Sequence, residues 1–389
     1  MKKHTTKPDK KDLRMLFVCI VNVFFLAASV GILGMTVYLS VIGFLPALYI
    51  VLLSLLCVIL IGFHVLLLTR KTAVKATQII SLVVSVVTLS VYMYASIMFG
   101  TLHGAISNIP IDNDLNTSTV TKDVSKEPFI VYISGIDARN ISAIHDKSLS
   151  DVNMIVVVNP NTHKILMVNT PRDYYVGLKG DPNKLDKLTH AGSYGIDWSM
   201  QTLASLYDID INYYIKVNFK SVVDIVNAVG GITVNSEYSF SSDASLSETR
   251  YYFKKGENTL NGDQALAFVR ERYTLPGGDR QRGINQQKVI GAVIDKAISP
   301  YILNSSNLKS LLDSFISNMK TNISYSEISD LIKMQLSKMP SWDIETVSVD
   351  GTGATKTTYS SGSQALYVMI PNQDSVDAAK DAINEVLNP

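Results

Sequence analysis

Residues 153–169 read NMIVVVNPNTHKILMVN, two apolar runs on either side of a polar turn. Both runs, Asn153–Val158 and Lys164–Asn169, have the β-branched and apolar composition of strands. The Asn-Pro-Asn-Thr sequence that joins them, residues 159–162, is typical of a tight turn. The stretch therefore predicts a β-hairpin in the core of a domain.

The segments around this hairpin alternate between strand and helix patterns. The aromatic and β-branched run Phe129–Ile136 predicts a buried strand, and further strands are predicted near Ile344–Val349 and Ala365–Ile370. Helices are predicted at Met200–Leu206, Ser221–Ala228 (ended by Gly230-Gly231), Asn285–Ile298, Leu308–Met319, Ser326–Leu336 and Ser375–Leu387. Strands mixed with helices predict an α/β sandwich with a mixed central sheet.

The first hundred residues are strongly apolar. Asp, Glu, Lys and Arg are absent from the sequence at Met15–Thr69 and again at Ala76–Ile111. A helix needs about 20 apolar residues to cross a bilayer, so the first run is long enough for two crossings. It is divided by Gly43-Phe44-Leu45-Pro46. We expect three transmembrane helices within residues 15–100, at Met15–Leu39, Leu45–Leu68 and Ile79–Phe99.

Basic residues indicate the orientation of these spans. Residues 1–14 carry six lysines and arginines, and the turn between the second and third spans carries Arg70, Lys71 and Lys75. The turn between the first and second spans carries no charge. Because cytoplasmic loops carry the basic excess, we expect a cytoplasmic tail at residues 1–14. Everything after Gly100 is then extracellular, in a multi-pass protein of the cell membrane.

The outer part is expected to begin with a linker at residues 101–127, rich in Asn, Thr, Ser and Asp, and to continue as one domain at residues 128–389. Both cysteines, Cys19 and Cys57, fall in predicted spans, so this domain must be stabilised by its core alone. Nine of the 35 basic residues but only two of the 34 acidic residues precede residue 76, so the remainder carries a net charge of −6. This charge argues against a nucleic-acid partner.

Two carboxylates stand at predicted strand ends. Asp137 follows the strand Phe129–Ile136, and Asp151 comes shortly before the strand that begins at Asn153. Carboxylate oxygens suit Mg²⁺, which leaves coordination positions for water and substrate phosphate. The pair predicts a metal site, with ordinary turn or cap positions as the alternative.

Arg172 follows the apolar strand Ile165–Val168 and precedes Asp173. An arginine at the end of a buried strand is well placed to enter a cleft, and a structural ion pair with Asp173 is the alternative. His190 lies in a nearby loop that is rich in glycine and aspartate. We expect it to be a loop or packing histidine rather than a catalytic base.

Arginines are concentrated between residues 270 and 282. Asn261 is expected to cap a short helix that ends at Ala267, after which an extended segment Val269–Tyr273 would direct Arg270 and Arg272 the same way. Arginine forks bind phosphate oxygens in pairs.

Arg282 and Gln286 are four residues apart at the expected start of the next helix, so they share a face near its positive end. With the Gly277-Gly278 turn beside them, these arginines predict a site for a multiply charged phosphate. A solvated basic surface is the alternative.

Taken in order along the chain, these motifs resemble those of the LytR–CpsA–Psr family. The resemblance covers about Phe129–Ser299 closely. Its motifs are Gly135-Ile136-Asp137, Ser150-Asp151, Thr170-Pro171-Arg172-Asp173, Lys187-Leu188-Thr189-His190-Ala191, Gly230-Gly231, Val269-Arg270-Glu271-Arg272 and the segment from Gly278-Asp279 to Asn285-Gln286-Gln287. Three spans before the domain are similar to the CpsA (Wzg) branch, which serves capsular polysaccharide and exopolysaccharide assembly.

The resemblance implies a phosphotransferase that moves a glycopolymer from undecaprenyl pyrophosphate to peptidoglycan. By position, Asp137 and Asp151 would hold Mg²⁺, or alternatively Mn²⁺, on the pyrophosphate. The resemblance also implies catalytic roles for Arg172, Arg270, Arg272 and Arg282, and substrate binding by Gln286, Lys187 and Asp279. The expected partners are the lipid-linked polysaccharide, peptidoglycan, the membrane and other capsule-assembly proteins. Apolar residues of the two helices after Gln287, among them Val289, Leu311 and Phe315, are expected either to line a polyprenyl pocket or to be plain core.

Two features depart from the family pattern. The family commonly has an arginine two residues before the second aspartate, where this chain has Leu149. The accessory domain usual in the CpsA branch is replaced by the short segment Thr101–Glu127. Two other functions stay open at this point: a membrane regulator that binds a lipid-linked ligand without turnover, and a hydrolase that uses water as the acceptor.

Overall fold

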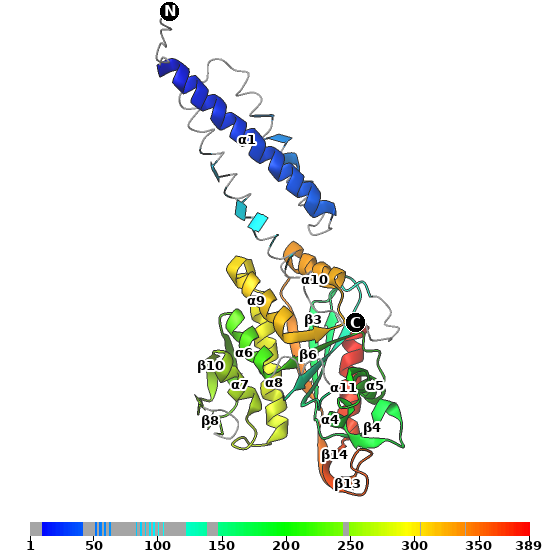
Figure 1. Ribbon diagram of the computed structural model, residues 1–389. Coiled ribbons are helices and arrows are strands. Elements are labelled where there is room, and N and C mark those ends of the chain that lie inside the picture. Colours follow the sequence, from blue (N-terminus) through cyan, green and yellow to red (C-terminus); the bar gives the residue numbers. More distant parts are fainter. Residues whose placement is uncertain are drawn as a thin grey trace, which may run out of the picture. The chain divides into compact units, whose positions relative to one another are not determined.

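The computed structural model describes residues 10–41, single positions between 51 and 104, and residues 122–137, 147–243, 249–303, 305–338 and 340–389. The chain divides into two units, Met1–His103 and Gly104–Pro389. In the first unit, helix α1 extends from Lys10 to Val41 and contains the first predicted membrane span (Figure 1).

The three predicted transmembrane helices are not supported by the structure. In the part of the chain that is described, no helix is both long and apolar enough to cross a membrane. Most of the spans predicted at Leu45–Leu68 and Ile79–Phe99 lie outside the described residues, as does most of the predicted linker. Residues 122–127 are described, and they form a turn whose Val124 is buried against the domain core.

The second unit is built on a six-stranded sheet with the order β11-β6-β1-β2-β3-β12. Its β2–β3 hairpin confirms the one predicted from the sequence, with Asn159 paired to Lys164 beside the turn. β6 is parallel to β1 and β12 is parallel to β3, whereas the other pairs are antiparallel, so the sheet is mixed as predicted. The strands are β1 (Phe129–Ile136), β2 (Val152–Asn159), β3 (Lys164–Thr170), β6 (Tyr213–Asn218), β11 (Met319–Thr321) and β12 (Asp343–Ser348).

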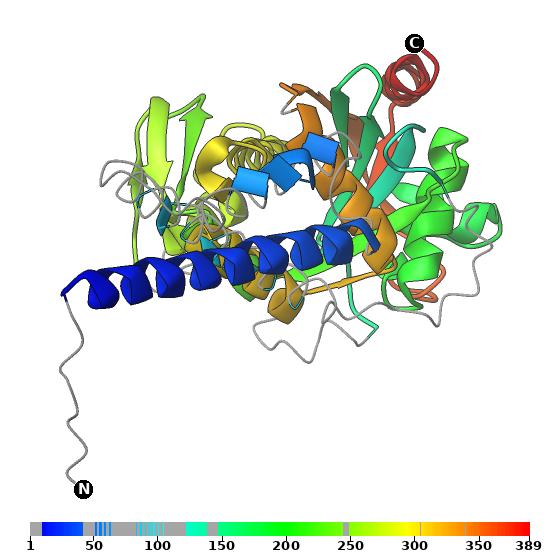
Figure 2. The same cartoon turned by 90° about the horizontal axis from the view of Figure 1, so that it is seen from above.

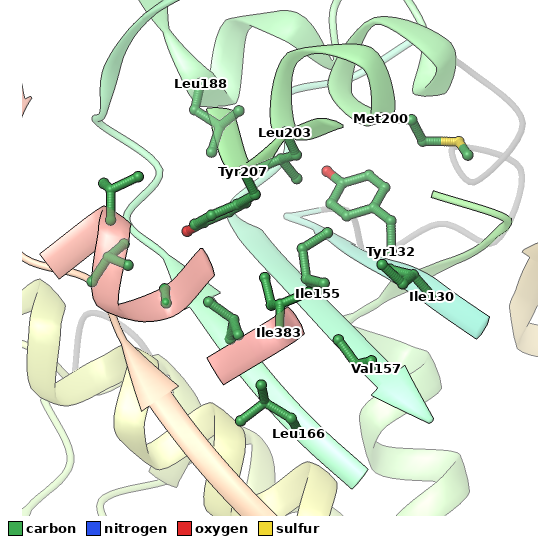
Figure 3. Packing of buried hydrophobic residues seen from close by; sticks show 14 of the residues in the cluster. Ile130, Tyr132, Ile155, Val157, Leu166, Leu188, Met200, Leu203, Tyr207 and Ile383 are labelled. Carbon is green, nitrogen blue, oxygen red and sulfur yellow. The ribbon is translucent and has the colours of Figure 1, made fainter. Parts of the chain in front are cut away.

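Helices cover both faces of this sheet. Successive side chains on a strand point to opposite faces, so neighbouring residues are buried in different clusters. Ile130 and Tyr132 of β1 pack with helices α5 (Ile196–Tyr207) and α11 (Gln373–Leu387), in the cluster drawn in Figure 3. Their neighbours Phe129 and Val131 pack on the other face, with α8 and α10. Figure 2 shows α11, in red, and α8, in yellow, on opposite sides of the sheet. The fold is therefore an α/β sandwich.

Among the remaining helices, α6, α7, α8 and α9 contribute to a second, lateral core around the buried Phe268. The remaining helices are α4 (Leu188–Ala191), α6 (Phe219–Ala228), α7 (Gly262–Arg270), α8 (Asp279–Ala297), α9 (Ser305–Asn318) and α10 (Tyr325–Lys338), with 3₁₀ turns at Leu178–Gly180 and Pro300–Leu303. Among the described residues, four two-stranded sheets lie outside the main one: β4 (Tyr175–Gly177) with β5 (Leu185–Lys187), β7 (Ile232–Ser236) with β10 (Gly256–Leu260), β8 (Phe240–Ser241) with β9 (Tyr252–Phe253), and β13 (Gly351–Thr357) with β14 (Ala365–Pro371).

Strand direction brings the predicted polar residues to one end of the sheet. β1, β3, β6 and β12 all run the same way, so their carboxyl ends meet there with the amino end of the antiparallel β2. Asp137 follows β1, Arg172 follows β3, and Asp151 precedes β2. The sheet thereby assembles a polar site from distant segments.

Candidate phosphate site

Arg172 and Asp151 form the central ion pair of this edge. Nη1 of Arg172 lies 2.5 Å from Oδ1 of Asp151, and both side chains are partly buried. The backbone N–H of Asp151 donates to the carbonyl of Gly135 at 2.7 Å, which fixes its position beside the end of β1. Burial acts to lower the pKa of Arg172, but the hydrogen bond and charge of Asp151, with Asp173 and Asp279, outweigh it and raise the pKa.

A second ion pair extends this cluster toward β5. Nζ of Lys187 lies 2.9 Å from Oδ1 of Asp173, whose Oδ2 is 3.8 Å from Nε of Arg172. Within the described part of the chain this buried Nε makes no hydrogen bond. The alternative of an ordinary Arg172–Asp173 pair therefore describes the structure poorly, because Asp151 is the main partner of Arg172.

Helix α8 brings Arg282 to the same cluster. The helix approaches the end of β3 so closely that a Cβ added at Gly283 would lie 2.1 Å from Nδ2 of Asn169. Arg282 forms an ion pair with Asp279 in the first turn of the helix. Burial, together with the positive charges of Arg172 and Arg272, lowers the pKa of Arg282 against the opposing charges of Asp279 and Asp151. Three arginines from three segments thus share one electrostatic environment.

Arg270 reaches the edge from helix α7. The predicted cap at Asn261 is present as a capping box with Gln264, but the helix continues to Arg270 rather than ending at Ala267, so the predicted extended segment was wrong at its start. The Arg270 guanidinium lies 4.3 Å from the centre of the Phe219 ring, and its Nη2 lies 4.0 Å from Oδ2 of Asp137. Phe219, at the start of α6, had no distinguishing signal in the sequence.

Glu271 and Arg272 follow this helix in a fixed turn. The Glu271 carboxylate is fully buried and accepts hydrogen bonds from the backbone N–H groups of Asp243, Arg272, Tyr273 and Thr274, at 2.6–3.0 Å. The Arg272 guanidinium stacks on Tyr273 at 4.6 Å. Sequence reasoning gave Glu271 no role, yet it fixes the backbone from which Arg272 projects.

The amide side chains of α8 divide between two tasks. Gln287 is buried and binds the carbonyls of Met167 and Val347 at 3.0 and 2.8 Å, so it ties the helix to β3 and β12. Gln286 is only partly buried, and its Nε2 lies 3.5 Å from the carbonyl of Val269. The predicted substrate-binding Gln286 thus stands on the same turn as the structural Gln287.

Asp137 and Asp151 lie at adjacent strand ends, as the predicted metal site requires. Asp137 is 56% exposed and Asp151 19% exposed at the side chain. In the described residues no group of three or more His, Cys, Asp or Glu side chains has a metal-binding arrangement. Mg²⁺ is commonly bound by one or two carboxylates plus phosphate oxygens and water. A site of this kind would be held by Asp137 and Asp151 and completed by phosphate oxygens and water.

Of the apolar residues considered for a polyprenyl pocket, those whose side chains the structure describes belong to the cores. Val289, Leu311 and Phe315 pack in the lateral core, and Ile290 and Ile294 pack against the sheet. His190 also has a structural position: its Nδ1 lies 2.6 Å from the fully buried Asp186 and 2.9 Å from Oγ of Ser360. Because both contacts use the same ring nitrogen, the imidazole does not relay a proton from the serine to the carboxylate.

The family comparison accounts for the order of these motifs. The model of the LytR_cpsA_psr family matches residues 94–385 of this chain. The chain is 35% identical over 245 residues to the polyisoprenyl-teichoic acid–peptidoglycan teichoic acid transferase TagU of Bacillus cereus, covering 62% of this chain and 77% of that protein. It is 32% identical over 268 residues to the protein of the same name from Bacillus licheniformis, covering 67% and 82%.

Solved structures show the same fold. Bacillus subtilis TagV superimposes with a TM-score of 0.56 at 29% identity, over 68% of this chain and 98% of that chain. The structure described as TagT bound to LIIa-WTA superimposes with a TM-score of 0.55 at 27% identity, over 72% and 100%. The family match spans the described sheet and every element that contributes to the phosphate site. The chain belongs to the LytR–CpsA–Psr family.

Proposed function

We propose that this chain transfers a glycopolymer from undecaprenyl pyrophosphate to a hydroxyl group of peptidoglycan. The observation that carries the proposal is the cluster of ion pairs at one sheet edge of an acidic domain: Arg172 pairs with Asp151, Arg282 pairs with Asp279, and Gly283 next to Arg282 packs against Asn169 of β3. An uncompensated charge is costly to bury, and the carboxylates of Asp151, Asp173 and Asp279 compensate Arg172 and Arg282 in part, so a phosphate is the further counter-charge that we propose. The names of the relatives, teichoic acid transferases, agree with a phosphorylated polymer donor.

The reaction exchanges one phosphate ester partner for another. The acceptor hydroxyl oxygen attacks the phosphorus that carries the glycopolymer, and the bond from this phosphorus to the bridging oxygen of the pyrophosphate breaks. The products are a phosphodiester between polymer and peptidoglycan, undecaprenyl phosphate, and the proton of the acceptor hydroxyl, which is released to solvent or to the leaving phosphate. Such transfers depend mostly on positioning and on stabilisation of negative charge.

The arginines perform both tasks in this proposal. Arg172 follows β3 and Arg282 lies on α8, and we assign their forks to the oxygens of one pyrophosphate. Arg270 and Arg272 add donors from the α7 end. Lys187, held by Asp173, and Gln286 are assigned to substrate binding, and Asp279 orients Arg282.

Asp137 and Asp151 are proposed to hold Mg²⁺, with Mn²⁺ as the alternative. The ion supplies charge neutralisation at the pyrophosphate oxygens. Asp151 has a further task, because it also orients Arg172 through their ion pair.

We also propose a location at the cell membrane with this domain outside. The basis is the sequence, in which long runs without charged residues are flanked by basic segments. The donor class supports it, since a polyprenyl-linked substrate resides in the bilayer. The resemblance to the CpsA branch suggests a capsular polysaccharide or exopolysaccharide as the polymer and capsule-assembly proteins as partners, whereas the relatives' names suggest a teichoic acid.

One experiment separates the proposed activity from the two alternatives. Full-length protein in detergent is incubated with undecaprenyl-pyrophosphate-linked glycan, peptidoglycan fragments and Mg²⁺, and products are identified by mass spectrometry. A phosphodiester conjugate supports the transferase. Release of phosphorylated glycan at equal rate with and without peptidoglycan would show a hydrolase instead. Donor binding without any product would show a regulator.

A further inference from the structure

The β13–β14 hairpin projects from the same end of the domain as the phosphate site. It lies outside the six-stranded sheet, at the bottom of Figure 1 below α4 and β4. At its base the backbone N–H of Met369 donates to the carbonyl of Asp173 at 2.8 Å. Asp350, which precedes β13, pairs with Arg280 of α8 at 3.1 Å. The hairpin therefore begins directly beside the residues that flank Arg172 and Arg282.

Tyr367 lies two residues further out along β14 than Met369. Its ring is close to Gly353 of the facing strand, where an added Cβ would lie 3.0 Å from Cε2 of the tyrosine. Nζ of Lys187 is 5.9 Å from the ring centre. The residue is nevertheless 53% exposed. A glycine thus lets an aromatic ring lie along the hairpin with much of its surface open to solvent.

A second exposed tyrosine stands at the hairpin tip. Tyr359 is 49% exposed, and its backbone N–H donates to the carbonyl of Leu185 at 2.8 Å. Its ring centre is 6.2 Å from that of Tyr194, which stacks on Trp198 at 4.6 Å. The tip is held by Ser360, whose N–H donates to the buried Asp186 at 2.8 Å. The aromatic group at the tip is therefore fixed in place.

The two tyrosines are aligned along β5. Tyr367 is beside Lys187 and Tyr359 is bonded at Leu185, two residues away on the same strand. Two strand residues span about 7 Å at roughly 3.3 Å each. Since Lys187 also binds Asp173, the order from the phosphate site outward is Asp173, Lys187 with Tyr367, then Tyr359. One extended ligand that starts at the phosphate site can contact both rings.

We propose that Tyr367 and Tyr359 form a binding track for the glycan strand of the acceptor. This inference rests on the proposed function, and it assigns the acceptor to one side of the phosphate site. A sugar ring has an apolar C–H face and a polar rim, which match an aromatic ring bordered by hydroxyl and ammonium groups. The face that carries Tyr367 offers hydroxyl groups at its cross-strand partner Thr355 and at Thr357, and Lys187 offers the ammonium group.

A glycan fits this surface better than a membrane does. Interfacial segments present a broad apolar face of Trp, Phe and Leu. On β13 the residues are small or polar, and the large exposed apolar side chains here are the two tyrosines and the single Leu185 of β5. The spacing of the two tyrosines along a rigid hairpin suits a linear chain of repeated units rather than a lipid surface.

Binding is measured first, with full-length protein in detergent and peptidoglycan glycan oligomers freed of their peptides. Titrations are followed by tryptophan fluorescence, which reports on Trp198 beside Tyr194. An aromatic contact contributes about 0.5–1.5 kcal/mol, so Tyr367→Ala and Tyr359→Ala should each raise the Kd about 2- to 13-fold. Tyr367→Phe should bind as wild type. The control is Tyr252→Ala, because Tyr252 is 70% exposed on β9, outside the hairpin.

Transfer kinetics give the second readout. In both alanine variants the KM for the glycan acceptor should rise by a similar factor, while the KM for the lipid-linked donor stays unchanged. Equal glycan binding by wild type and both variants, or an equal loss in Tyr252→Ala, overturns the track. So does tyrosine-dependent binding of anionic lipid vesicles without glycan binding. If wild type binds glycan through the two tyrosines but transfers no polymer, the proposed function fails and the track stands.

Discussion

Arg172 follows β3 and Asp151 precedes β2, and the guanidinium of the one lies 2.5 Å from the carboxylate of the other at the edge of the sheet. Asp151 orients Arg172 and is also assigned to the metal, so it links the arginine cluster to the proposed metal site. Loss of the carboxylate therefore affects both phosphate binding and metal binding, and the substitutions must be chosen to separate the two effects.

Arg172→Lys keeps the positive charge but removes the fork that binds two oxygens. We expect turnover to fall about 10²- to 10³-fold, the typical loss for one donor to a developing anion, with a melting temperature near that of wild type. Arg270→Lys should behave in the same way. The matched control is Arg280→Lys in the first turns of α8, where the side chain is 54% exposed. Unimpaired transfer by Arg172→Lys would leave the arginine cluster without a catalytic role.

Asp137→Ala and Asp151→Ala should each abolish Mg²⁺-dependent turnover and leave the domain folded. The two should differ in one respect, because only Asp151 holds Arg172 at hydrogen-bond distance. Donor binding measured in the presence of chelator should therefore weaken in Asp151→Ala more than in Asp137→Ala. Asp381→Ala, an exposed change on α11, serves as control. Full activity of either variant with chelator present would remove the metal from the mechanism.

Phe219→Leu tests the contact between the Phe219 ring and the Arg270 guanidinium at 4.3 Å. Cation–π contacts contribute about 0.5–2 kcal/mol, so kcat should fall roughly 2- to 30-fold as Arg270 loses its fixed orientation. Phe219→Tyr keeps an aromatic face and should restore most of the rate. Equal rates for the leucine and tyrosine variants would show that the ring does not position the arginine.

Glu271→Gln should destabilise the domain by about 1–3 kcal/mol, because a buried carboxylate that accepts four backbone N–H groups is replaced by an amide with a single acceptor oxygen. Thermal unfolding monitored by circular dichroism measures the change. Glu257→Gln is the control, since this side chain is exposed on β10. Melting curves that coincide for the two variants would contradict the assigned role.

Asp186 gives the hairpin a pH dependence. Burial acts to raise its pKa, but hydrogen bonds from His190, Ser360 and Lys187 outweigh this and hold the pKa at about 2, below the ordinary 3.8. A carboxyl with a lowered folded-state pKa stabilises the fold above its unfolded pKa and ceases to do so as the pH falls through the folded value. The stability difference between wild type and Asp186→Asn should be present at pH 5 and shrink from about pH 4 to pH 2. A difference that grows on acidification would contradict this account.

Much of this fold is encoded in local patterns. The β1 strand and the β2–β3 hairpin were predicted almost to the residue, because buried β-branched runs with a strong turn leave little choice of structure. The central strand β6 (YYIKVN) was missed, since its buried Lys216 and Asn218 break the apolar run. The strand β13 was missed because its Gly- and Thr-rich sequence lacks the apolar alternation of a strand.

The sequence identified the residues of the site better than it predicted the bounds of their helices and their contacts. Arg172, Asp151 and Arg282 were found from their places at strand and helix ends, which any sheet with this order brings together. Helix α8 was expected to begin at Asn285 but begins at Asp279, because glycines and arginines before the apolar stretch hide the first turn. The positions of Phe219 and Glu271 depend on tertiary contacts between distant segments, which no local pattern reveals.

The separate hairpin has an evolutionary consequence. Strands β13 and β14 form a sheet of their own that contacts the rest of the domain at Asp173, Tyr174, Leu185 and Asp186, while the arginines are mounted on the main sheet and its helices. Selection can therefore alter the exposed side chains of the hairpin, its aromatic content or charge, while those few contacts keep its base in place. Paralogues within one bacterium would be able to diverge in this appendage and serve different wall architectures with an unchanged catalytic scaffold. Grafting the hairpin between relatives is accordingly the natural route to redirecting such an enzyme.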